Sequence, residues 1–314
     1  MKKTFLGIEI GGTKLQLVTG DEAGTLRERR RLAVNPSEGA AGIRRQIEQA
    51  LPELLRQNVV HAVGVGFGGP VDWRAGKIAR SHQIEGWSGF DLAGWLRQLA
   101  GVPVVVDNDA NLAAFGEATR GAGVGFNPVF YFNLGSGVGG GLVVNRSIYH
   151  GAAPGEVEFG HLRLDRTGTT VESKCSGWAV DKKIRRWKAD APDSLLSKLT
   201  ADSTGGEARH LAAALQGGDA LAQRILAETA EDLAFALSHA VHLLHPAIIV
   251  LGGGLAQVGE PLRAAIESVL PRFLMEAFLP APPICPATLG EDAVPVGALC
   301  LAARFAADAP LVAT

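Results

Sequence analysis

Short apolar runs separated by glycine-rich or polar segments fill the first part of the chain and predict strands alternating with helices. Residues 5–10 form an apolar run that ends at two glycines, and residues 15–19 form a second run with partial alternation. Residues 29–34 predict a third strand, so we expect an opening β-meander with a glycine-rich first turn. Residues 40–56 then place apolar side chains on one helical face, because they recur every three or four positions.

A strand-to-helix corner is the first place where this pattern indicates chemistry. Residues 102–106 predict a buried strand, and a helix-forming run covers residues 112–118. The sequence Asp-Asn-Asp-Ala-Asn at 107–111 lies between them, at the carboxyl end of a strand, where open α/β sheets place their ligands. From this stretch alone, two interpretations stay open: Asn108 or Asp109 caps the helix, or Asp109 is an active-site base.

The opening pattern occurs a second time. Residues 129–134 predict a strand, residues 135–141 a glycine turn, and residues 142–144 a second strand. The first glycine of this turn lies about 124 residues after the first glycine of the earlier one. We interpret the repeat as an internal duplication of one structural unit. Two like halves would form a cleft in which each half offers one glycine turn to a shared ligand.

The rest of the chain predicts mostly helices around one further strand. A basic helix is expected over residues 178–187, a long helix over 219–244, and a strand over 247–251 that ends in three glycines. Further helices are expected over 260–269 and 296–307. The basic helix is typical of a solvated surface, with an oligomer interface as the alternative.

Composition narrows the class of protein. The chain has 314 residues, 47% of them hydrophobic and 20% charged, and a net charge of −2. It has no basic block and no apolar run of about 18 residues, so we expect neither a nucleic-acid partner nor a membrane span. Its three cysteines are far apart, which indicates a reducing cytoplasm and neither disulfides nor a cysteine-based zinc site.

The glycine turns themselves suggest anion binding. Residues 135–140 match the Gly-x-Gly-x-x-Gly dinucleotide fingerprint, but a strand and not a helix is expected after them, so the match is weak. No glycine-rich stretch has the spacing of a P-loop. Backbone amides in such turns can form concavities that hold anions, and plain hairpins are the alternative.

At this point the chain resembles a known family. The motifs are residues 7–14, 66–72, 108–111 with Glu117, 134–144, 158–161 and 251–254. In this order they resemble those of the ROK family (repressors, ORFs, sugar kinases), over nearly the whole chain. The resemblance implies a two-domain, actin-like α/β sugar kinase fold, ribonuclease H-like and duplicated, with a central interdomain cleft. The expected domains are residues 1–118 plus 298–314 and residues 119–297.

The resemblance also implies an activity, which is the ATP-dependent phosphorylation of a hexose or N-acetylated amino sugar. Asp109 would be the general base for the attacking sugar hydroxyl. The sugar would also contact Gly69, Asn108, Glu158, His161 and Glu172. The phosphates would lie at two turns, formed by Gly11, Gly12, Thr13 and Lys14 and by Gly135, Ser136 and Gly137. Gly253 and Gly254 would lie against the adenosine. Phosphoryl transfer needs little more than positioning, charge neutralisation and one base.

Several positions depart from the family pattern. Residues 162–171 contain no cysteine where the family carries a zinc motif, so no zinc is expected, and His161 binds sugar or is a hydrogen-bonded core histidine. Glu9 replaces the usual aspartate, and we expect it to contact Mg²⁺ through water. Ser136 replaces a threonine and keeps the hydroxyl. Gln83 stands near where an asparagine is often found.

Alternatives to an ATP-dependent kinase stay open. Polyphosphate-dependent glucokinases of the family are similar in the segment without cysteine, so the phosphate donor is undecided. A non-catalytic sugar sensor would keep the sugar-binding cleft but would not turn over substrate. A phosphotransferase of the acetate-kinase type would phosphorylate a carboxylate. The family's repressors carry a DNA-binding domain before the first glycine turn, which we do not expect here. A cytoplasmic homodimer that closes on its sugar is the expected assembly, with hinges near residues 117–124 and 295–297.

Overall fold

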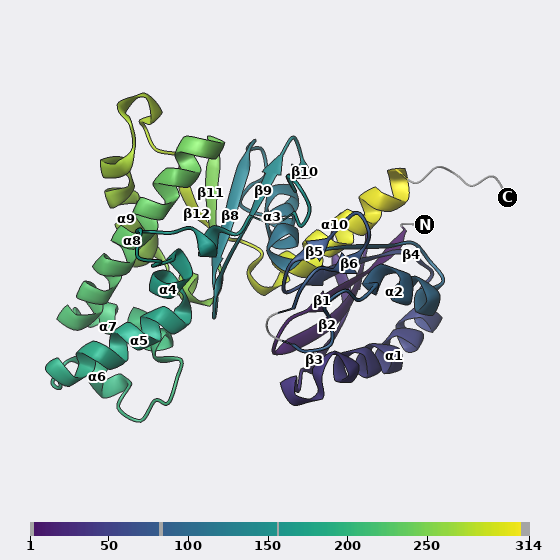
Figure 1. The fold of residues 1–314 in the computed structure, drawn as a ribbon, viewed down its shortest axis with the longest axis horizontal. Helices are drawn as coiled ribbons and strands as arrows, with labels where there is room; N and C mark the ends of the chain where they lie inside the picture. Colours follow the sequence, from purple (N-terminus) through teal and green to yellow (C-terminus); the bar gives the residue numbers. More distant parts are fainter. Residues whose placement is uncertain (1–2, 82–83, 156, 309–314) are drawn as a thin grey trace. The chain divides into compact units, whose positions relative to one another are not determined.

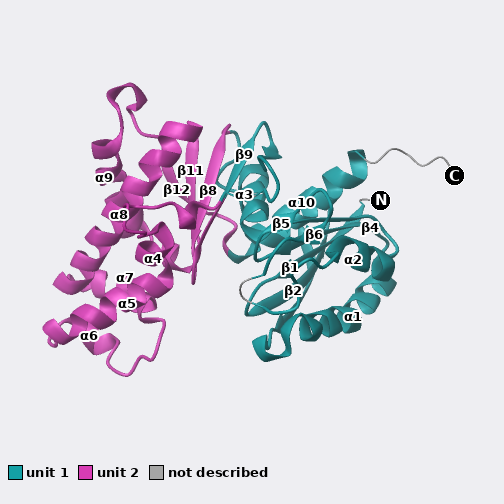
Figure 2. Ribbon diagram, viewed as in Figure 1, with its two compact units in different colours: residues 1–125, 141–157, 291–314 teal, residues 126–140, 158–290 magenta. Residues whose placement is uncertain are grey.

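The computed structural model describes residues 3–81, 84–155 and 157–308. The chain divides into two compact units (Figure 2). Unit 1 comprises residues 1–125, 141–157 and 291–314, and unit 2 comprises residues 126–140 and 158–290. Each unit is therefore built from segments that are distant in the sequence.

A five-stranded sheet forms the centre of unit 1 (Figure 1). Its strands are β1 (Thr4–Ile10), β2 (Lys14–Gly20), β3 (Leu26–Ala33), β4 (Val60–Phe67) and β7 (Val104–Asn108). The order across the sheet is β3-β2-β1-β4-β7. Strands β1 to β3 form the antiparallel meander that the sequence predicts, and β4 and β7 run parallel to β1. Parallel pairing places the carboxyl ends of β1, β4 and β7 at one edge of the sheet.

Helices cover both faces of this sheet. Their bounds are α1 (Gly39–Gln57), α2 (Leu92–Ala100), α3 (Asp109–Arg120) and α10 (Ala293–Asp308), and a small hairpin joins β5 (Val71–Asp72) to β6 (Lys77–Ile78). Leu6 and Ile8 of β1 lie in one core with Ile43 of α1, whereas Phe5 packs with Leu299 of α10 on the other face. Neighbouring strand residues point to opposite faces, so one strand contributes to both cores.

Helix α10 packs unusually close to its neighbours in unit 1. A Cβ on Gly297 would collide with the carbonyl of Leu112 in α3, and a Cβ on Gly64 of β4 would collide with the carbonyl of Ala298. Glycine at these positions therefore allows backbone to approach backbone. This packing holds α3 against the sheet at the end where Asp109 begins the helix.

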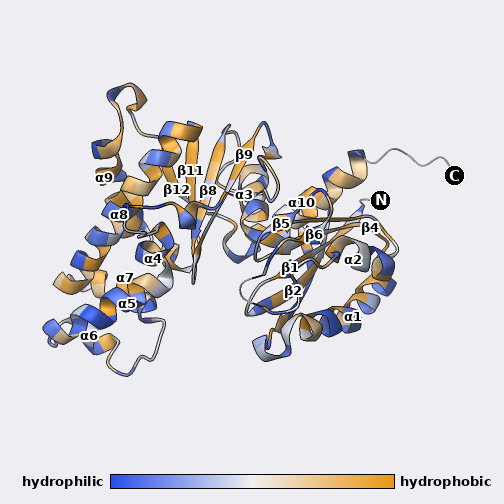
Figure 3. Ribbon diagram, viewed as in Figure 1, coloured by the Kyte–Doolittle hydropathy of each residue, from blue (hydrophilic) through white to orange (hydrophobic). Residues whose placement is uncertain are grey.

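A second five-stranded sheet repeats the topology of the first. Its strands are β8 (Val129–Leu134), β9 (Val138–Val144), β10 (Ser147–Ile148), β11 (Ile248–Gly252) and β12 (Ile284–Pro286). The order is β10-β9-β8-β11-β12, which matches the first sheet strand for strand. In Figure 3, strands such as β8 and β11 are coloured as hydrophobic, as expected for strands covered on both faces. The predicted internal duplication is confirmed by this order.

Unit 2 is rich in helices (Figure 1). They are α4 (Val171–Cys175), α5 (Gly177–Trp187), α6 (Leu195–Leu199), α7 (Leu211–Gln216), α8 (Ala220–Leu244) and α9 (Glu260–Val269). Asp219 caps α8 by accepting a hydrogen bond from the backbone N–H of Ala222 at 2.8 Å. The helix ends at His245, whose left-handed backbone (φ 46°) precedes Pro246. The long helix predicted over residues 219–244 is confirmed.

Two boundaries differ from the sequence expectations. The second glycine turn is shorter than residues 135–141, because β9 already begins at Val138. The units also do not follow the expected boundaries at 118 and 297: residues 141–157 belong to unit 1, where Gly141 lies against Ala114 of α3. Two domains that close on a sugar stay a prediction. In the part of the chain that is described, no helix combines the length and apolar character needed to cross a membrane.

Candidate active site

The first glycine turn joins β1 to β2 in unit 1. The backbone N–H of Gly11 donates to the carbonyl of Lys14 at 2.9 Å and closes the turn. The carboxylate of Glu9, 12% exposed, lies 3.0 Å from Lys14 Nζ and also accepts a hydrogen bond from the Gln16 amide. Both carboxylate oxygens of Glu9 are therefore engaged, one by Lys14 and the other by Gln16.

The corner between β7 and α3 separates the roles of two adjacent residues. Asn108 is the N-cap of α3: its Oδ1 accepts from the backbone N–H groups of Ala110 at 2.8 Å and Asn111 at 3.1 Å. Asp109 is the first helical residue and is half-buried, with Oδ1 accepting from Ala110 N at 2.8 Å. The capping interpretation is therefore correct for Asn108, and a base at Asp109 stays a prediction.

The turn that follows β4 lies beside this corner. The Asn108 amide donates to the carbonyl of Gly69 at 3.1 Å. A Cβ on Gly68 would lie 3.3 Å from Asp109 Oδ2, so the glycine backbone passes directly beside the carboxylate. Gly69 has φ 153°. Three of the predicted residues, Gly69, Asn108 and Asp109, are thus brought together within unit 1.

The second glycine turn joins β8 to β9 and is held from two sides within unit 2. The Gly135 N–H donates to the Gly137 carbonyl at 2.9 Å, and the Gly177 N–H donates to the Gly135 carbonyl at 2.8 Å. The Glu172 carboxylate accepts from the Val138 N–H at 2.9 Å, and a Cβ on Gly137 would collide with it. Glu172, predicted to bind sugar, therefore also supports this turn.

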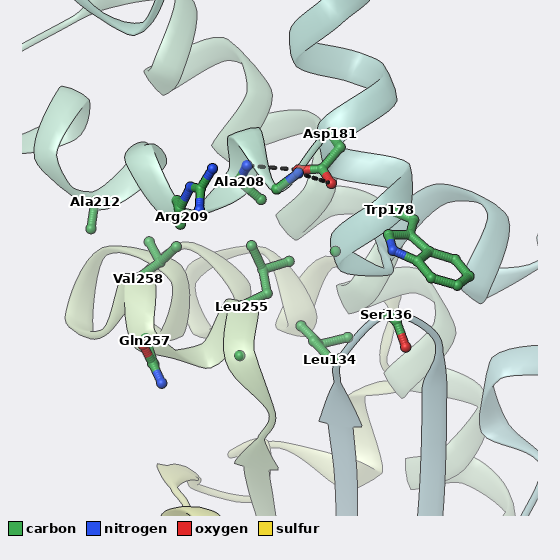
Figure 4. Close-up of a pocket in the computed structure, with 14 residues that line it drawn as sticks. Leu134, Ser136, Trp178, Asp181, Ala208, Arg209, Ala212, Leu255, Gln257 and Val258 are labelled. Atoms are coloured by element: carbon green, nitrogen blue, oxygen red, sulfur yellow. Dashed lines mark hydrogen bonds between the residues drawn. The ribbon is translucent and has the colours of Figure 1, made fainter. Parts of the chain in front are cut away.

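A pocket of about 480 Å³ opens beside this turn in unit 2 (Figure 4). Leu134, Leu255 and Val258 give it an apolar wall, and Ser136 lies at its edge. Gly254 also lines the pocket, and its contact with adenosine stays a prediction. Its neighbour Gly253 must be glycine for packing, because a Cβ there would lie 2.5 Å from the backbone N of Leu134.

The predicted pair Glu158 and His161 lies on a short 3₁₀ turn in unit 2. Their side chains are 50% and 72% exposed, with His161 Nε2 3.9 Å from a Glu158 carboxylate oxygen. A core histidine would be buried, so that interpretation of His161 is wrong. Phe159 between them is buried against Phe130 and Phe132 and anchors the turn.

Comparison with known proteins shows the family to which the chain belongs. A family model described as the ROK family matches residues 5–304. The chain belongs to the ROK family. It is similar to the glucokinase of Halalkalibacterium halodurans, with 30% identity over 309 residues that cover 93% of each protein. It is also similar to the glucokinase of Thermotoga maritima, with 27% identity over 305 residues that cover 95% of this chain and 96% of that protein.

A solved structure of the family extends this likeness to the fold. The crystal structure of a ROK family glucokinase from Streptomyces griseus, in complex with glucose and AMPPNP, superposes with a TM-score of 0.83. The two sequences are 31% identical, and the match covers 96% of this chain and 99% of that one. Both the predicted family and the predicted actin-like sugar kinase fold are confirmed, and the relatives support a hexose kinase activity.

Several pocket residues of this ROK protein were not among the predicted site residues. Trp178, at the start of α5, is 65% exposed and lines the pocket. Asp181, one helical turn later, is buried and accepts from the N–H groups of Gly206 at 3.0 Å and Ala208 at 2.7 Å. Figure 4 shows Trp178 near Ser136, with Arg209 and Ala212 on the opposite side of the labelled set. In the sequence, the adjacent glycines at 205–206 could have indicated the loop that folds against α5.

The basic helix α5 is only partly a solvated face. Arg185 makes hydrogen bonds to both carboxylate oxygens of Glu207, each 2.9 Å long, and Glu207 is fully buried. Lys183 lies 3.1 Å from the Thr229 hydroxyl. Arg185 therefore fastens α5 to the segment around residues 206–209 that lines the pocket, and Lys183 fastens it to α8.

Whether the protein alone could hold a metal ion depends on which donor side chains lie close together. Among the described residues, no three or more His, Cys, Asp or Glu side chains gather in a way that could hold a metal ion. Burial raises the pKa of the Cys175 thiol to about 12, so this sulfur stays protonated. A Mg²⁺ ion that arrives with nucleotide phosphates needs few protein ligands, and a contact of Glu9 with such an ion stays a prediction. The absence of zinc stays a prediction, and Gln83 lies outside the described residues.

Proposed function

We propose that this chain is an ATP-dependent hexose kinase of the glucokinase type. The observation that carries the proposal is the position of Asp109, which begins α3 beside the Gly68–Gly69 backbone while Asn108 takes over the capping of the helix. The likeness to glucokinases over nearly the whole chain supports the same activity. Glucose is therefore the first sugar to test.

In this proposal, Asp109 removes the proton from the sugar hydroxyl that attacks the γ-phosphorus of ATP. The oxygen of the hydroxyl forms the new bond to phosphorus, and the bond from the γ-phosphorus to the bridging oxygen of ADP breaks. A base that orients and deprotonates the nucleophile is sufficient for this chemistry. Asn108 and Gly69 would hold the sugar near the base, and Glu158, His161 and Glu172 are further proposed sugar ligands.

The pocket of unit 2 would hold the nucleoside of ATP. Its apolar wall suits an adenine ring, and Ser136 lies at the edge where the phosphates would begin. The backbone amides of the two glycine turns would bind phosphate oxygens. Lys14 would add positive charge, and Glu9 would hold a water of the Mg²⁺ that accompanies ATP.

Substitution of the base tests this function. Asp109→Asn should lower kcat roughly a hundredfold or more, equivalent to about 3 kcal/mol of transition-state stabilisation. The assay couples ADP release to sugar addition, with glucose and N-acetylated amino sugars as acceptors. Asp91→Asn is the matched control, because Asp91 also begins a helix in unit 1 and caps it by accepting from Gly94 at 2.9 Å.

Two results would contradict the proposal. Full activity of Asp109→Asn would exclude Asp109 as the base. A folded wild-type protein that binds sugar by calorimetry but releases no ADP would instead indicate the sensor function. Polyphosphate assayed beside ATP decides the donor.

A further inference from the structure

Asp107 is a buried carboxylate directly before the proposed sugar-binding and catalytic pair, and the proposed function does not use it. Its exposed fraction is 3%. Oδ1 accepts from the Asn108 N–H at 2.8 Å and from the Asn111 amide at 2.9 Å. A carboxylate removed from water is stable only when hydrogen bonds replace its hydration. These two bonds satisfy one oxygen, and the other requires a donor.

His150 supplies that donor. Its Nε2 lies 2.7 Å from Asp107 Oδ2, and its side chain is 13% exposed. An ionised carboxylate only accepts hydrogen bonds, so Nε2 carries the proton. The imidazole stacks on the ring of Trp73, with 4.1 Å between centroids and 15° between planes. The stacking fixes the plane of the ring, and thereby the direction of its N–H.

The same segment is tied to α3 at a second point. The Asn111 amide donates to Asp107 Oδ1 and also to the carbonyl of Gly155 at 2.9 Å. Residues 150–155 are thus bonded both to the end of β7 and to the first turn of α3. All of these groups belong to unit 1. Asp109 is the first residue of that turn, so its direction depends on how Asp107 and Asn111 are held.

We infer that His150 is a positioning residue for the proposed base: by hydrogen bonding to Asp107, it fixes the start of α3 from which Asp109 projects. The inference rests on the proposed function of Asp109 and names a determinant of rate that lies outside the reacting groups. His150 does not itself exchange a proton with the sugar. A small misplacement of a catalytic group lowers kcat strongly, whereas binding of ATP, which His150 is not proposed to contact, is expected to be unchanged.

Two substitutions separate the hydrogen bond from the stacking. His150→Phe keeps a ring that can lie on Trp73 but removes the donor, and His150→Gln keeps an N–H donor but removes the ring. We expect kcat to fall about tenfold in the first variant, with an unchanged KM for ATP, and to be largely restored in the second. His61→Phe is the matched control, since His61 bonds to Thr4 in the same unit and is distant in sequence from this cluster.

A second measurement does not depend on turnover. Hydrogen exchange of the peptide spanning residues 105–120 should be faster in His150→Phe than in wild type and in His150→Gln. If His150→Phe does not fold, His150→Asn replaces it, because the shorter side chain leaves its donor short of Asp107. A wild-type kcat in folded His150→Phe, or in its replacement His150→Asn, would overturn the inference. An equal loss of kcat in that variant and in His150→Gln would also overturn it.

The two proposals fail in different ways. A wild-type protein without kinase activity would refute the proposed function, and the exchange measurement would still decide whether His150 holds the start of α3. If the wild type is active, and His150→Phe is equally active with unchanged hydrogen exchange over residues 105–120, the positioning role of His150 is refuted. The proposed role of Asp109 as the base is then unaffected.

Discussion

Asn108 and Asp109, at the end of β7 and the start of α3, are adjacent in the sequence but make different contacts. Asn108 is 7% exposed and its side chain serves the helix and the Gly69 carbonyl, whereas Asp109 is half-buried beside the glycine backbone. From this stretch of sequence alone, two interpretations stayed open: Asn108 or Asp109 caps the helix, or Asp109 is an active-site base. A short polar side chain at an N-cap and a carboxylate in the first turn are both favourable, so local preferences do not separate them.

The pocket proposed for the nucleoside can be tested with a single side chain. Ala212 of α7 lines it, so Ala212→Trp should fill part of the space and raise the KM for ATP about tenfold or more, which corresponds to about 1.4 kcal/mol of lost binding. Ala213→Trp is the matched control, because Ala213 is exposed on the same helix. Steady-state kinetics should show an unchanged KM for the sugar in both variants. Equal KM values for ATP would place the nucleoside elsewhere.

At the scale of elements, α8 depends on its N-cap, and the pKa of that residue makes the dependence sensitive to pH. Burial by itself would raise the pKa of Asp219, but hydrogen bonds from Ala222 N–H, the Ser194 hydroxyl and Leu195 N–H outweigh it and lower the pKa. A folded-state pKa below the unfolded value means that the carboxylate stabilises the fold above the unfolded value of about 4. That contribution is lost as the pH falls through the lower, folded-state value.

Asp219→Ala should therefore lower the free energy of unfolding by about 1 kcal/mol at neutral pH. The difference from wild type should shrink below about pH 4, where the wild-type carboxylate also loses its charge. Urea denaturation followed by far-UV circular dichroism at neutral and acidic pH measures both values. Asp193→Ala is the control, because Asp193 is exposed in the loop before α6, next to Ser194. A difference that stays constant with pH would show that the charge of Asp219 contributes nothing.

The elements themselves were largely predictable, and the candidate site only in part. Apolar runs and glycine turns marked both sheets, because strands buried on both faces leave a clear pattern. No comparable pattern in the sequence marks the residues that form the wall of the pocket. Asp181 matters there because loop residues 25 and 27 positions later donate to it. Likewise, His150 and Asp107 are 43 residues apart and meet only once α3 is packed. Groupings of this kind depend on tertiary structure.

For the whole molecule, the path of the chain predicts that the two units unfold together. The chain passes from one unit to the other after residues 125, 140, 157 and 290, and β9 contributes residues to both units. Neither unit is a continuous segment of the chain. Unfolding of one unit therefore removes strands or connections that the other unit requires. We therefore expect one cooperative transition, although chains of this size often show several.

The tryptophans allow this prediction to be tested. Trp73, Trp87 and Trp95 belong to unit 1, whereas Trp178 and Trp187 belong to unit 2. Replacing the latter pair with phenylalanine leaves a protein whose fluorescence reports on unit 1 alone. Its thermal midpoint by fluorescence should coincide with its midpoint by far-UV circular dichroism, which follows helices of both units. Two separated midpoints would show that unit 1 persists or melts by itself, and that the shared strand does not couple the units.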